Sequence, residues 1–457
     1  MKAVFVGGGS LKLIGILREA MSVPGLFEDG EINLYDLNVP RAEAMGRMLM
    51  KTPEHRGIKC KITWGTSLEK ALDGADMVGV IFRAGSWLAF EQMANASLKH
   101  GFFCSDNISP QGAFLAMKGG PIILDIARKM EKLCPNAWLV NFANPTAVLS
   151  GIVNHHTKIK ALGVCQGYTN HQADLTRVIM RKDEYSYDYD VDVAGINHLS
   201  FILRGTLRGK DIFPMLDKQT AAPWKAPKLN PLTGKGPLNS ITNLVKIYQR
   251  LGVLVFSTEG DGNAHLIYDE AVEETLKTSI PSANAKVRMR MKDMQKTDEW
   301  FRSHIDKELP KSFWSGNLST NRIFGKSHDD IFVRILKGIS GIETIRIVTS
   351  RPNNGAVDGF KDRTILEYSQ ELHKSKIKPV GNLYVPDVVY GMTAALATHQ
   401  TMLADAIATR DPRLLAHALL SYPVHPYSKK ATKLYKELLA INEKEIAPEL
   451  RRVGMYL

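Results

Sequence analysis

The first third of the chain alternates short apolar runs with segments of helical spacing, and this alternation constrains the fold more than any other feature. The apolar runs read KAVFVG, EINLYD, DMVGVIF, WLVNFANP and IKALGVC, at residues 2–7, 31–36, 76–82, 138–145 and 159–165. Apolar residues recur at helical spacing in the segments 10–21, 40–50, 87–99 and 118–133. Strand–helix alternation predicts an α/β fold with a Rossmann-type, doubly wound parallel sheet, whose ligands bind at the carboxyl ends of the strands.

The pattern changes near residue 185, which predicts a second domain of mixed α+β structure. Residues 189–213, YDVDVAGINHLSFILRGTLRGKDIF, are typical of two antiparallel strands joined near Arg208-Gly209-Lys210. Residues 385–410 and 429–446 have the apolar spacing of long helices. We therefore expect a Rossmann-like domain over residues 1–190 and an α+β domain over residues 191–457.

Composition narrows the class of protein. Apolar residues make up 44% of the 457 residues, enough for a sizeable core. No apolar run approaches the roughly 18 residues that span a bilayer, and the start does not read as a signal peptide, so we expect a cytoplasmic protein without membrane contact. The cysteines stand far apart, which favours free thiols over a disulfide framework; they are Cys60, Cys104, Cys134 and Cys165.

The chain is basic, with 59 Lys and Arg against 47 Asp and Glu and a formal charge of +12. These charges are spread along the sequence, and the densest segment, residues 285–296, is typical of the exposed face of a helix. Signatures of nucleic-acid-binding modules are absent from the sequence, so we expect no nucleic-acid partner. A basic surface also suits an anionic small molecule, although surface charge alone identifies no pocket.

A glycine-rich loop follows the first apolar run. Glycines without a Cβ let backbone amides approach a pyrophosphate, and the loop supplies Gly7, Gly8 and Gly9. Ser10 can cap the following helix or bond a phosphate oxygen. Lys12 replaces the third glycine of the G-x-G-x-x-G pattern, so a tight turn with a helix cap remains an alternative. Asp36 ends the second run, where an acid binds the ribose hydroxyls of NAD, and the combination favours NAD.

Cys165 and His198 follow or adjoin strand-like runs in the segments GVCQGY and GINHLS. By residue type alone, a buried structural cysteine and a core histidine are the commoner interpretations. A thiolate and an imidazole also suit a borderline divalent metal. Two protein ligands are few for a structural site, so such a metal would be catalytic.

Eight segments together resemble glycoside hydrolase family 4, and they follow the order of that family over most of the chain. They are FVGGGS (5–10), LYD (34–36), FRAGSWLAFEQMANASLKHG (82–101), NFANPT (141–146), GVCQGY (163–168), AGINH (194–198), GDGNAH (260–265) and NNGAV (353–357). The resemblance implies a glycosidase that uses NAD and a divalent metal, usually Mn²⁺. It implies that NAD oxidises the sugar at C3, that the metal assists deprotonation at C2, and that elimination is followed by addition of water and re-reduction.

The resemblance also implies roles for individual residues. Cys165 and His198 would bind the metal, and Asp261 would be the catalytic base. Residues implied to contact substrate are Arg83, Asp106, Asn144, Asn197 and His265, of which Arg83 and Asn144 would also contact the cofactor. Gln166 departs from the family, because an amide cannot act as a general acid at the position after the metal cysteine.

The sequence leaves alternatives open. A 2-hydroxyacid or sugar dehydrogenase on the same scaffold would accumulate NADH with product, whereas the glycosidase would regenerate NAD in each turnover. A binding or regulatory protein that has lost activity is a third interpretation, which Gln166 supports. GDGNAH lacks the tyrosine of members that act on phosphosugars, so we expect an α-hexoside or α-hexuronide, with Arg83, Arg346 and Arg351 as candidates to pair a carboxylate. The resemblance implies a homodimer or homotetramer.

Overall fold

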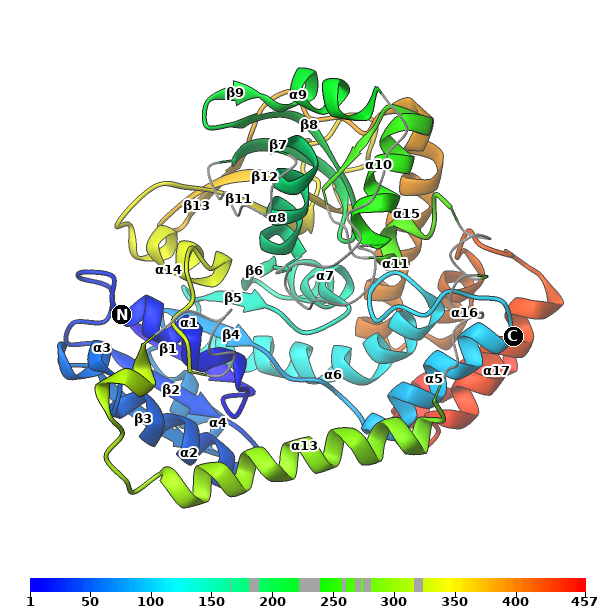
Figure 1. Cartoon of the computed structure of the whole chain (residues 1–457). Coiled ribbons are helices and arrows are strands. Elements are labelled where there is room, and N and C mark those ends of the chain that lie inside the picture. Colours follow the sequence, from blue (N-terminus) through cyan, green and yellow to red (C-terminus); the bar gives the residue numbers. More distant parts are fainter. Residues whose placement is uncertain are drawn as a thin grey trace.

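The computed structural model describes residues 1–165, 167–180, 189–221, 239–256, 260–267, 273, 281–315 and 324–457 (Figure 1). Within these residues the strands form a single mixed sheet in the order β10-β8-β7-β12-β11-β6-β5-β4-β1-β2-β3, with β13 paired to β12 and β9 to β8. The strands are β1 Lys2–Val6, β2 Glu31–Tyr35, β3 Lys61–Gly65, β4 Met77–Val80, β5 Trp138–Asn141, β6 Lys160–Gly163, β7 Tyr189–Ile196, β8 Leu199–Leu207, β9 Lys210–Asp211, β10 Leu254–Val255, β11 Ile345–Pro352, β12 Ile365–His373 and β13 Lys376–Pro379.

The six strands before residue 165 are mutually parallel, which confirms the predicted fold class. Five of them coincide with the predicted apolar runs, and β3 was missed because its sequence, KITWG, has one buried position and forms no continuous apolar run. The parallel half meets the antiparallel half where β6 pairs with β11 through Gly163 and Ser350. The division into residues 1–190 and 191–457 stays a prediction.

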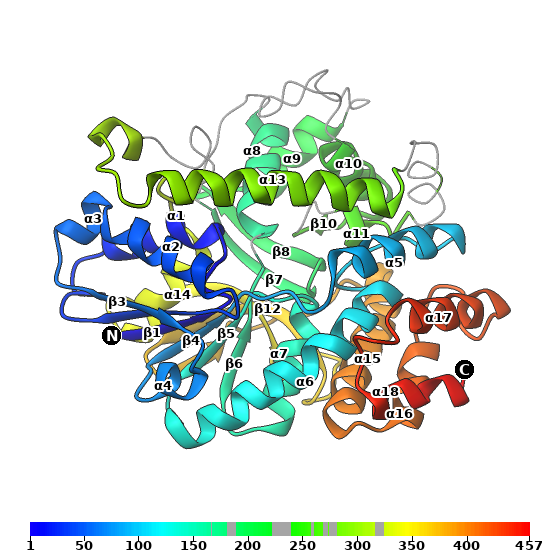
Figure 2. The same cartoon turned by 90° about the horizontal axis from the view of Figure 1, so that it is seen from below.

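Helices cover both faces of the sheet (Figure 2). One core cluster contains the inner faces of α1, α2 and α14, and the other contains those of α5, α6, α7 and α15. The α-helices are α1 Lys12–Met21, α2 Val39–Met50, α3 Pro53–Arg56, α4 Leu68–Leu72, α5 Trp87–Lys99, α6 Pro110–Leu133, α7 Thr146–His156, α8 Gly167–Met180, α9 Ile212–Thr220, α10 Asn239–Leu251, α11 Gly260–Asn263, α13 Ala283–His304, α14 Ile331–Ser340, α15 Asp387–Thr409, α16 Pro412–Leu420, α17 Lys429–Ile441 and α18 Pro448–Arg451; short 3-10 helices span Lys311–Trp314 and Arg452–Met455.

Helix starts near the site carry side-chain caps. Ser86 accepts a hydrogen bond from the Ala89 amide at the start of α5, and Ser109 accepts one from the Gln111 amide at the start of α6. Pro110 occupies the first position of α6, where its missing N–H costs nothing. These caps fix where the two helices begin, and both beginnings lie just after segments that carry candidate site residues.

The sequence predicted one antiparallel turn in residues 189–213, and the structure contains that turn and an earlier one that was missed. Ile196 pairs with Leu199, so the chain reverses at Asn197 and His198, and His198 has a φ of 70°. The expected turn is also present, because Arg208 and Gly209 join β8 to the antiparallel two-residue strand β9, which begins at Lys210. Apolar residues on both sides of Asn197 hide the turn in the sequence, whereas Arg-Gly-Lys is the stronger turn signal.

Helix α13 runs across the molecule and contacts α5 near one end and α2 near the other (Figures 1 and 2). Only Ala283 and Phe301 of its 22 residues are buried, which confirms that residues 285–296 form an exposed basic helix. Among the described residues, no helix combines the length and the apolar character needed to cross a membrane.

Candidate active site

The glycine loop joins β1 to α1 at the carboxyl edge of the parallel sheet. Gly7 has a φ of 97°, and a Cβ on Gly8 would lie 2.7 Å from the backbone of Leu34. The amides of Gly7 and Gly8 both donate to the carbonyl oxygen of Tyr35 at 2.9 Å. The conformation and the close approach to β2 therefore require glycine at both positions.

Asp36 follows β2 and faces this loop. Its Oδ2 accepts a hydrogen bond from the Gly9 amide at 2.9 Å, and its Oδ1 accepts one from the Asn38 amide at 2.8 Å. The N-cap of α1 is Leu11, without a side-chain cap bond, so Ser10 does not serve as the helix cap. Backbone donors thus hold the Asp36 carboxylate beside the loop, as expected for a residue that binds ribose hydroxyls.

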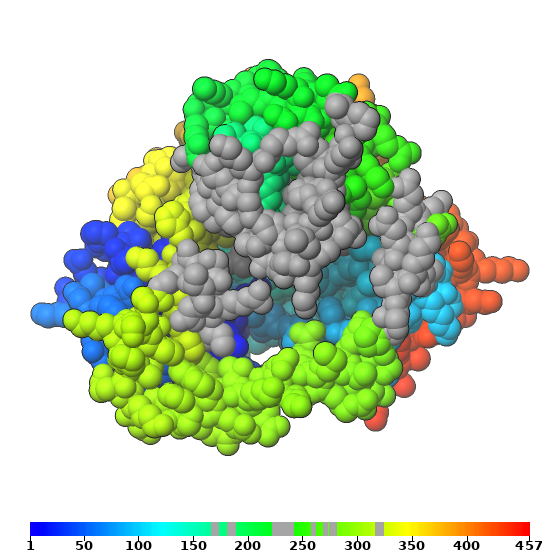
Figure 3. All heavy atoms as spheres, in the orientation of Figure 1, coloured from blue at the N-terminus to red at the C-terminus, as the bar shows by residue number. Residues whose placement is uncertain are grey.

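A cleft of about 610 Å³ lies beside Leu11, the residue that follows the loop. Its walls come from the start of α1, from α2, from α5 and from α13, and the surface is hollowed along this side of α13 (Figure 3). The lining residues are Leu11, Arg41, Glu91, Pro281, Lys286, Met289, Arg290, Asp293, Met294 and Thr297. The cleft is therefore bounded on one side by Leu11, which directly follows the glycine loop, and on the other by the basic helix.

Cys165 and His198 lie together, as the metal-site prediction requires. Cys165 Sγ is 3.4 Å from His198 Nε2, at the end of β6 and in the β7–β8 turn respectively. Two ligands of one divalent metal, at bond lengths near 2.3 Å for sulfur and 2.05 Å for nitrogen, are about 3.1 Å apart at a right angle and about 3.6 Å apart at the tetrahedral angle. The observed separation falls between these values, so the pair fits a shared metal ion.

Asn107 forms a hydrogen bond with His198 of this pair, and sequence reasoning missed it. The Thr146 amide donates to Asn107 Oδ1 at 3.0 Å, which fixes the orientation of the Asn107 side-chain amide. Asn107 Nδ2 then donates to His198 Nε2 at 3.2 Å. Because Nδ2 is a donor only, His198 Nε2 accepts this bond through its lone pair, and a metal would bind that same lone pair in place of Asn107.

Asp106 and Asn144 extend the same network. Asn144 Nδ2 donates to Asp106 Oδ2 at 2.8 Å, and Thr146 Oγ1 donates to Asn144 Oδ1 at 3.0 Å. Asp106 is adjacent in sequence to Asn107, so the pair lies beside Cys165 and His198. The structure thus brings four of the predicted residues into one cluster: Asp106, Asn144, Cys165 and His198.

Arg83 follows β4 and packs against aromatic rings. Its guanidinium carbon is 3.3 Å from the ring centroid of Trp87, and that of Arg290 on α13 is 3.6 Å from Trp87. Burial, together with the nearby charge of Arg290, lowers the pKa of the Arg83 guanidinium to about 10, so it remains charged at neutral pH. Arg83 Nε and Nη1 are buried and have no hydrogen-bond partner in the described part of the chain.

The other two arginine candidates lie in different surroundings. Arg346 forms ion pairs with Asp190 and Asp192 on β7. Burial lowers the pKa of Arg351, whose guanidinium carbon is 5.9 Å from the ring of Trp138. Of the three arginines, Arg83 is the one that shares an electrostatic interaction with Asp106.

Asn197 and His265 lie inside the protein. Asn197 Nδ2 donates to Glu367 Oε2 at 2.9 Å, and Asn197 is 1% exposed. His265 Nε2 is 2.8 Å from the hydroxyl of Tyr422 in the described structure, and His265 is 4% exposed. Each side chain supports its own turn or loop, and its contact with substrate stays a prediction.

Helix α11 carries Asp261 and packs on the backbone of His198. A Cβ on Gly262 would lie 1.5 Å from the carbonyl oxygen of His198, so only glycine permits this approach. The Asp261 backbone belongs to α11, whereas its side chain lies outside the described structure. Gln166 also lies outside the described residues.

The fold and the clustered side chains define an α/β enzyme with a glycine loop and a thiol–imidazole pair at the carboxyl edge of one sheet. Two family models match the chain: Family 4 glycosyl hydrolase over residues 2–181, and its C-terminal domain over residues 193–425. The chain belongs to the family 4 glycosyl hydrolases. This confirms the family inferred from the sequence motifs and the prediction of a glycosidase rather than a dehydrogenase.

Relatives span the whole chain. The chain is 24% identical to an alpha-galacturonidase of Thermoanaerobacter italicus, covering 96% of this chain and 95% of that protein. It is 23% identical to a 6-phospho-beta-glucosidase of Escherichia coli, covering 97% and 96%. Its fold matches a 6-phospho-alpha-glucosidase from gut microorganisms, solved with NAD and Mn²⁺, at a TM-score of 0.80, 18% identity and 97% and 98% coverage.

Proposed function

We propose that this glycosidase hydrolyses an α-linked hexuronide. NAD would bind at the glycine loop, and a divalent cation, preferably Mn²⁺, would bind at Cys165 and His198. The proposal of a metal site rests on the separation of 3.4 Å between Cys165 Sγ and His198 Nε2. The proposal of a uronide substrate rests on the buried Nε and Nη1 atoms of Arg83, which have no hydrogen-bond partner in the described part of the chain. The alpha-galacturonidase among the relatives supports the same substrate class.

When bound, NAD would supply a hydride acceptor, and the cation would stabilise negative charge on neighbouring sugar oxygens. The Gly9 and Asn38 amides hold the Asp36 carboxylate in place, and Asp36 would orient the ribose of the cofactor. Asn107 helps to hold the His198 ring next to Cys165, and the cation would take the place of its contact with Nε2. The Gly7, Gly8 and Gly9 amides and His198 Nε2 all make contacts within the protein, so binding of the pyrophosphate and of the cation would exchange some of these contacts.

The sugar hydroxyls would meet Asp106 and Asn144. Asp106 is an acceptor, and its Oδ2 is oriented by the Asn144 amide at 2.8 Å. Asp261 would remove the proton from C2, because α11 approaches the His198 backbone so closely that its residues lie near the metal pair. The proton for the departing oxygen comes from a group other than Gln166, because an amide does not ionise at accessible pH.

Arg83 would bind the carboxylate of the hexuronide. A buried donor without a partner costs about 1–3 kcal/mol, and a carboxylate that accepts from Nε and Nη1 removes that cost. Arg83 remains charged at neutral pH and presents a planar pair of donors. An uncharged hexoside offers a hydroxyl oxygen in place of the carboxylate, which can accept a hydrogen bond but supplies neither the negative charge nor the second oxygen of a bidentate pair.

A panel of aryl α-galacturonide, α-galactoside and 6-phosphoglycosides, assayed with NAD, Mn²⁺ and a reductant, tests the proposal. We expect fastest release of the aryl group from the α-galacturonide, with no net accumulation of NADH. Arg83→Gln should reduce kcat/KM for the uronide more than for the galactoside, whereas the exposed Arg410→Gln should change neither. A 6-phosphoglycoside as the best substrate, or equal losses on both substrates, would overturn the substrate assignment.

We also propose a cytoplasmic homodimer or homotetramer. No disulfide joins the four cysteines in the described structure, and a thiol that serves as a metal ligand must remain reduced, which the cytoplasm favours. Light scattering during size-exclusion chromatography measures the assembly, and a monomer at micromolar concentration would contradict it.

A further inference from the structure

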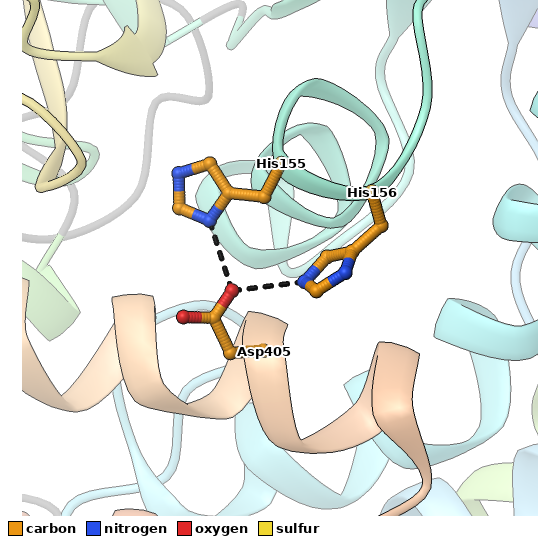
Figure 4. A group of neighbouring side chains, drawn as sticks. All are labelled: His155, His156 and Asp405. Atoms are coloured by element: carbon orange, nitrogen blue, oxygen red, sulfur yellow. Dashed lines mark hydrogen bonds and ion pairs between the residues drawn. The ribbon is translucent and has the colours of Figure 1, made fainter.

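A second cluster of metal-ligand side chains lies between α7 and α15, away from the residues assigned to the active site. His155 and His156 are the last two residues of α7, and Asp405 projects from α15 toward both rings (Figure 4). His155 Nδ1 is 3.1 Å and His156 Nε2 is 2.9 Å from Asp405 Oδ1. The three ligand atoms all lie within 4.8 Å of one another.

We propose that this triad of His155, His156 and Asp405 binds a divalent transition-metal ion of the Zn²⁺ class, independently of the Cys165–His198 site. Ligand atoms at about 2.05 Å from one metal are about 2.9 Å apart at a right angle and about 3.3 Å apart at the tetrahedral angle. Both nitrogen–oxygen distances fall in that interval. Two imidazoles and a carboxylate match the preference of Zn²⁺, Co²⁺ and Ni²⁺, with water completing the coordination.

The surroundings of the triad favour a cation. The carboxyl end of α7 carries the negative end of the helix dipole, and both histidines belong to its last turn. His155 is 4% exposed, and its Nε2 makes no hydrogen bond among the described residues, so Nδ1 is the atom that this ring presents. Thr146, at the other end of α7, contacts the active-site network, so the helix places roughly 15 Å between the two sites.

Arg363 already provides one positive charge at this position. Its Nη2 donates to Asp405 Oδ1 at 2.7 Å and to Oδ2 at 2.8 Å, and it lies 3.4 Å from His155 Nδ1. Arg363 therefore competes with a metal for the carboxylate. The side chain is 62% exposed, and an exposed ion pair contributes only about 0–1 kcal/mol, so the guanidinium can move into solvent when a metal binds. Removing Arg363 should strengthen metal binding.

Equilibrium dialysis of the full-length Cys165→Ser protein against Co²⁺, after chelator treatment, isolates the triad from the first site. We expect about one Co²⁺ per chain and a higher melting temperature with the metal. Adding Asp405→Asn or His156→Gln should weaken Co²⁺ binding at least tenfold, and adding Arg363→Ala should tighten it severalfold. His100→Gln is the matched control, because it removes a histidine–carboxylate contact, to Glu437 at 2.8 Å, outside the triad.

The outcomes separate a metal site from a purely structural ion-pair cluster. Absence of bound Co²⁺ in Cys165→Ser would overturn the proposal. Equal binding with and without Asp405→Asn would also overturn it, because the metal would then lie elsewhere. The expected gain from Arg363→Ala cannot arise from unfolding, so it keeps the test decisive if the other variants lose stability.

Discussion

Replacing Gly262 with alanine would place a methyl group 1.5 Å from the carbonyl oxygen of His198. Real Cβ contacts are essentially never shorter than 3.0 Å, so α11 and the β7–β8 turn must separate by at least about 1.5 Å. The turn carries His198, and α11 carries Asp261. Gly262→Ala therefore changes the distance between the proposed base and the proposed metal ligand without altering either side chain.

A misplacement of about 1 Å can reduce catalysis by about 100-fold, so we expect kcat to fall by at least that factor. Aryl-glycoside hydrolysis with saturating NAD and Mn²⁺ measures kcat, and the same assay over a range of Mn²⁺ measures the metal requirement. We expect the Mn²⁺ concentration for half-maximal rate to rise, because His198 moves with the turn. Thermal unfolding of the same preparation reports whether the fold persists.

Gly391→Ala is the matched control for this substitution. A Cβ at Gly391, on the exposed side of α15, meets nothing within 4 Å, and alanine there stabilises a helix by up to about 1 kcal/mol. We expect wild-type kinetics from this control. A Gly262→Ala enzyme that folds and retains wild-type kcat would refute the argument that α11 and the hairpin turn are spatially coupled for catalysis.

The remaining predictions concern the metal, the cofactor, the buried core and pH. Cys165→Ser should abolish Mn²⁺-dependent hydrolysis while Cys60→Ser retains it, and a retained rate in Cys165→Ser would remove the ligand assignment. Removal of NAD with charcoal should abolish activity until NAD is added back. Full activity without NAD would contradict the requirement for this cofactor. Tyr422→Phe loses the buried bond to His265 and should lower the free energy of unfolding by about 1 kcal/mol in urea, with an unchanged m value; an unaltered midpoint would argue against that bond. Burial raises the pKa of the Glu19 carboxyl from 4.5 to about 7. Below pH about 4.5 the carboxyl is protonated in both the folded and the unfolded state and does not affect stability. Between pH about 4.5 and 7 the unfolded state ionises first, so the free energy of unfolding falls as the pH rises, and above pH 7 the loss reaches at most about 3 kcal/mol. Glu19→Gln should thus stabilise the protein at pH 8 and hardly at pH 5, and equal pH profiles would exclude this cost.

Local patterns identified the parallel half of the fold. β1 is apolar at four of its five positions and is followed at once by glycine, and Asp36 stands at the end of β2. These signals depend on neighbouring residues, which is why sequence reasoning could locate the glycine loop and its acid. Cys165 and His198 were found through the family resemblance, because residue type alone favoured structural roles for both.

The supporting residues were missed because their partners are distant in sequence. Asn107 is 91 residues from His198, and Tyr422 is 157 residues from His265. Glu367, which holds Asn197, is 170 residues away from it. Each is a polar residue in an ordinary local context, so its function depends on the tertiary arrangement that brings β12 beside β7, or the segment after α16 beside α11. An alignment of one motif with one family segment does not contain that information.

Basic residues of α13 lie next to Arg83, the residue that we propose binds the substrate. With two buried residues, α13 depends on polar contacts for its place, and it is held by Glu91, which pairs with Lys286 at 3.2 Å and Arg290 at 3.4 Å. The Glu91 side chain is only 7% exposed, so these pairs are screened less than surface pairs. Arg290 contacts the Trp87 ring that Arg83 also contacts, and its charge contributes to the lowered pKa of Arg83. The electrostatic environment of Arg83 therefore depends on α13 remaining against α5, which makes Glu91 a determinant of the charge at the position where we propose that the sugar carboxylate binds.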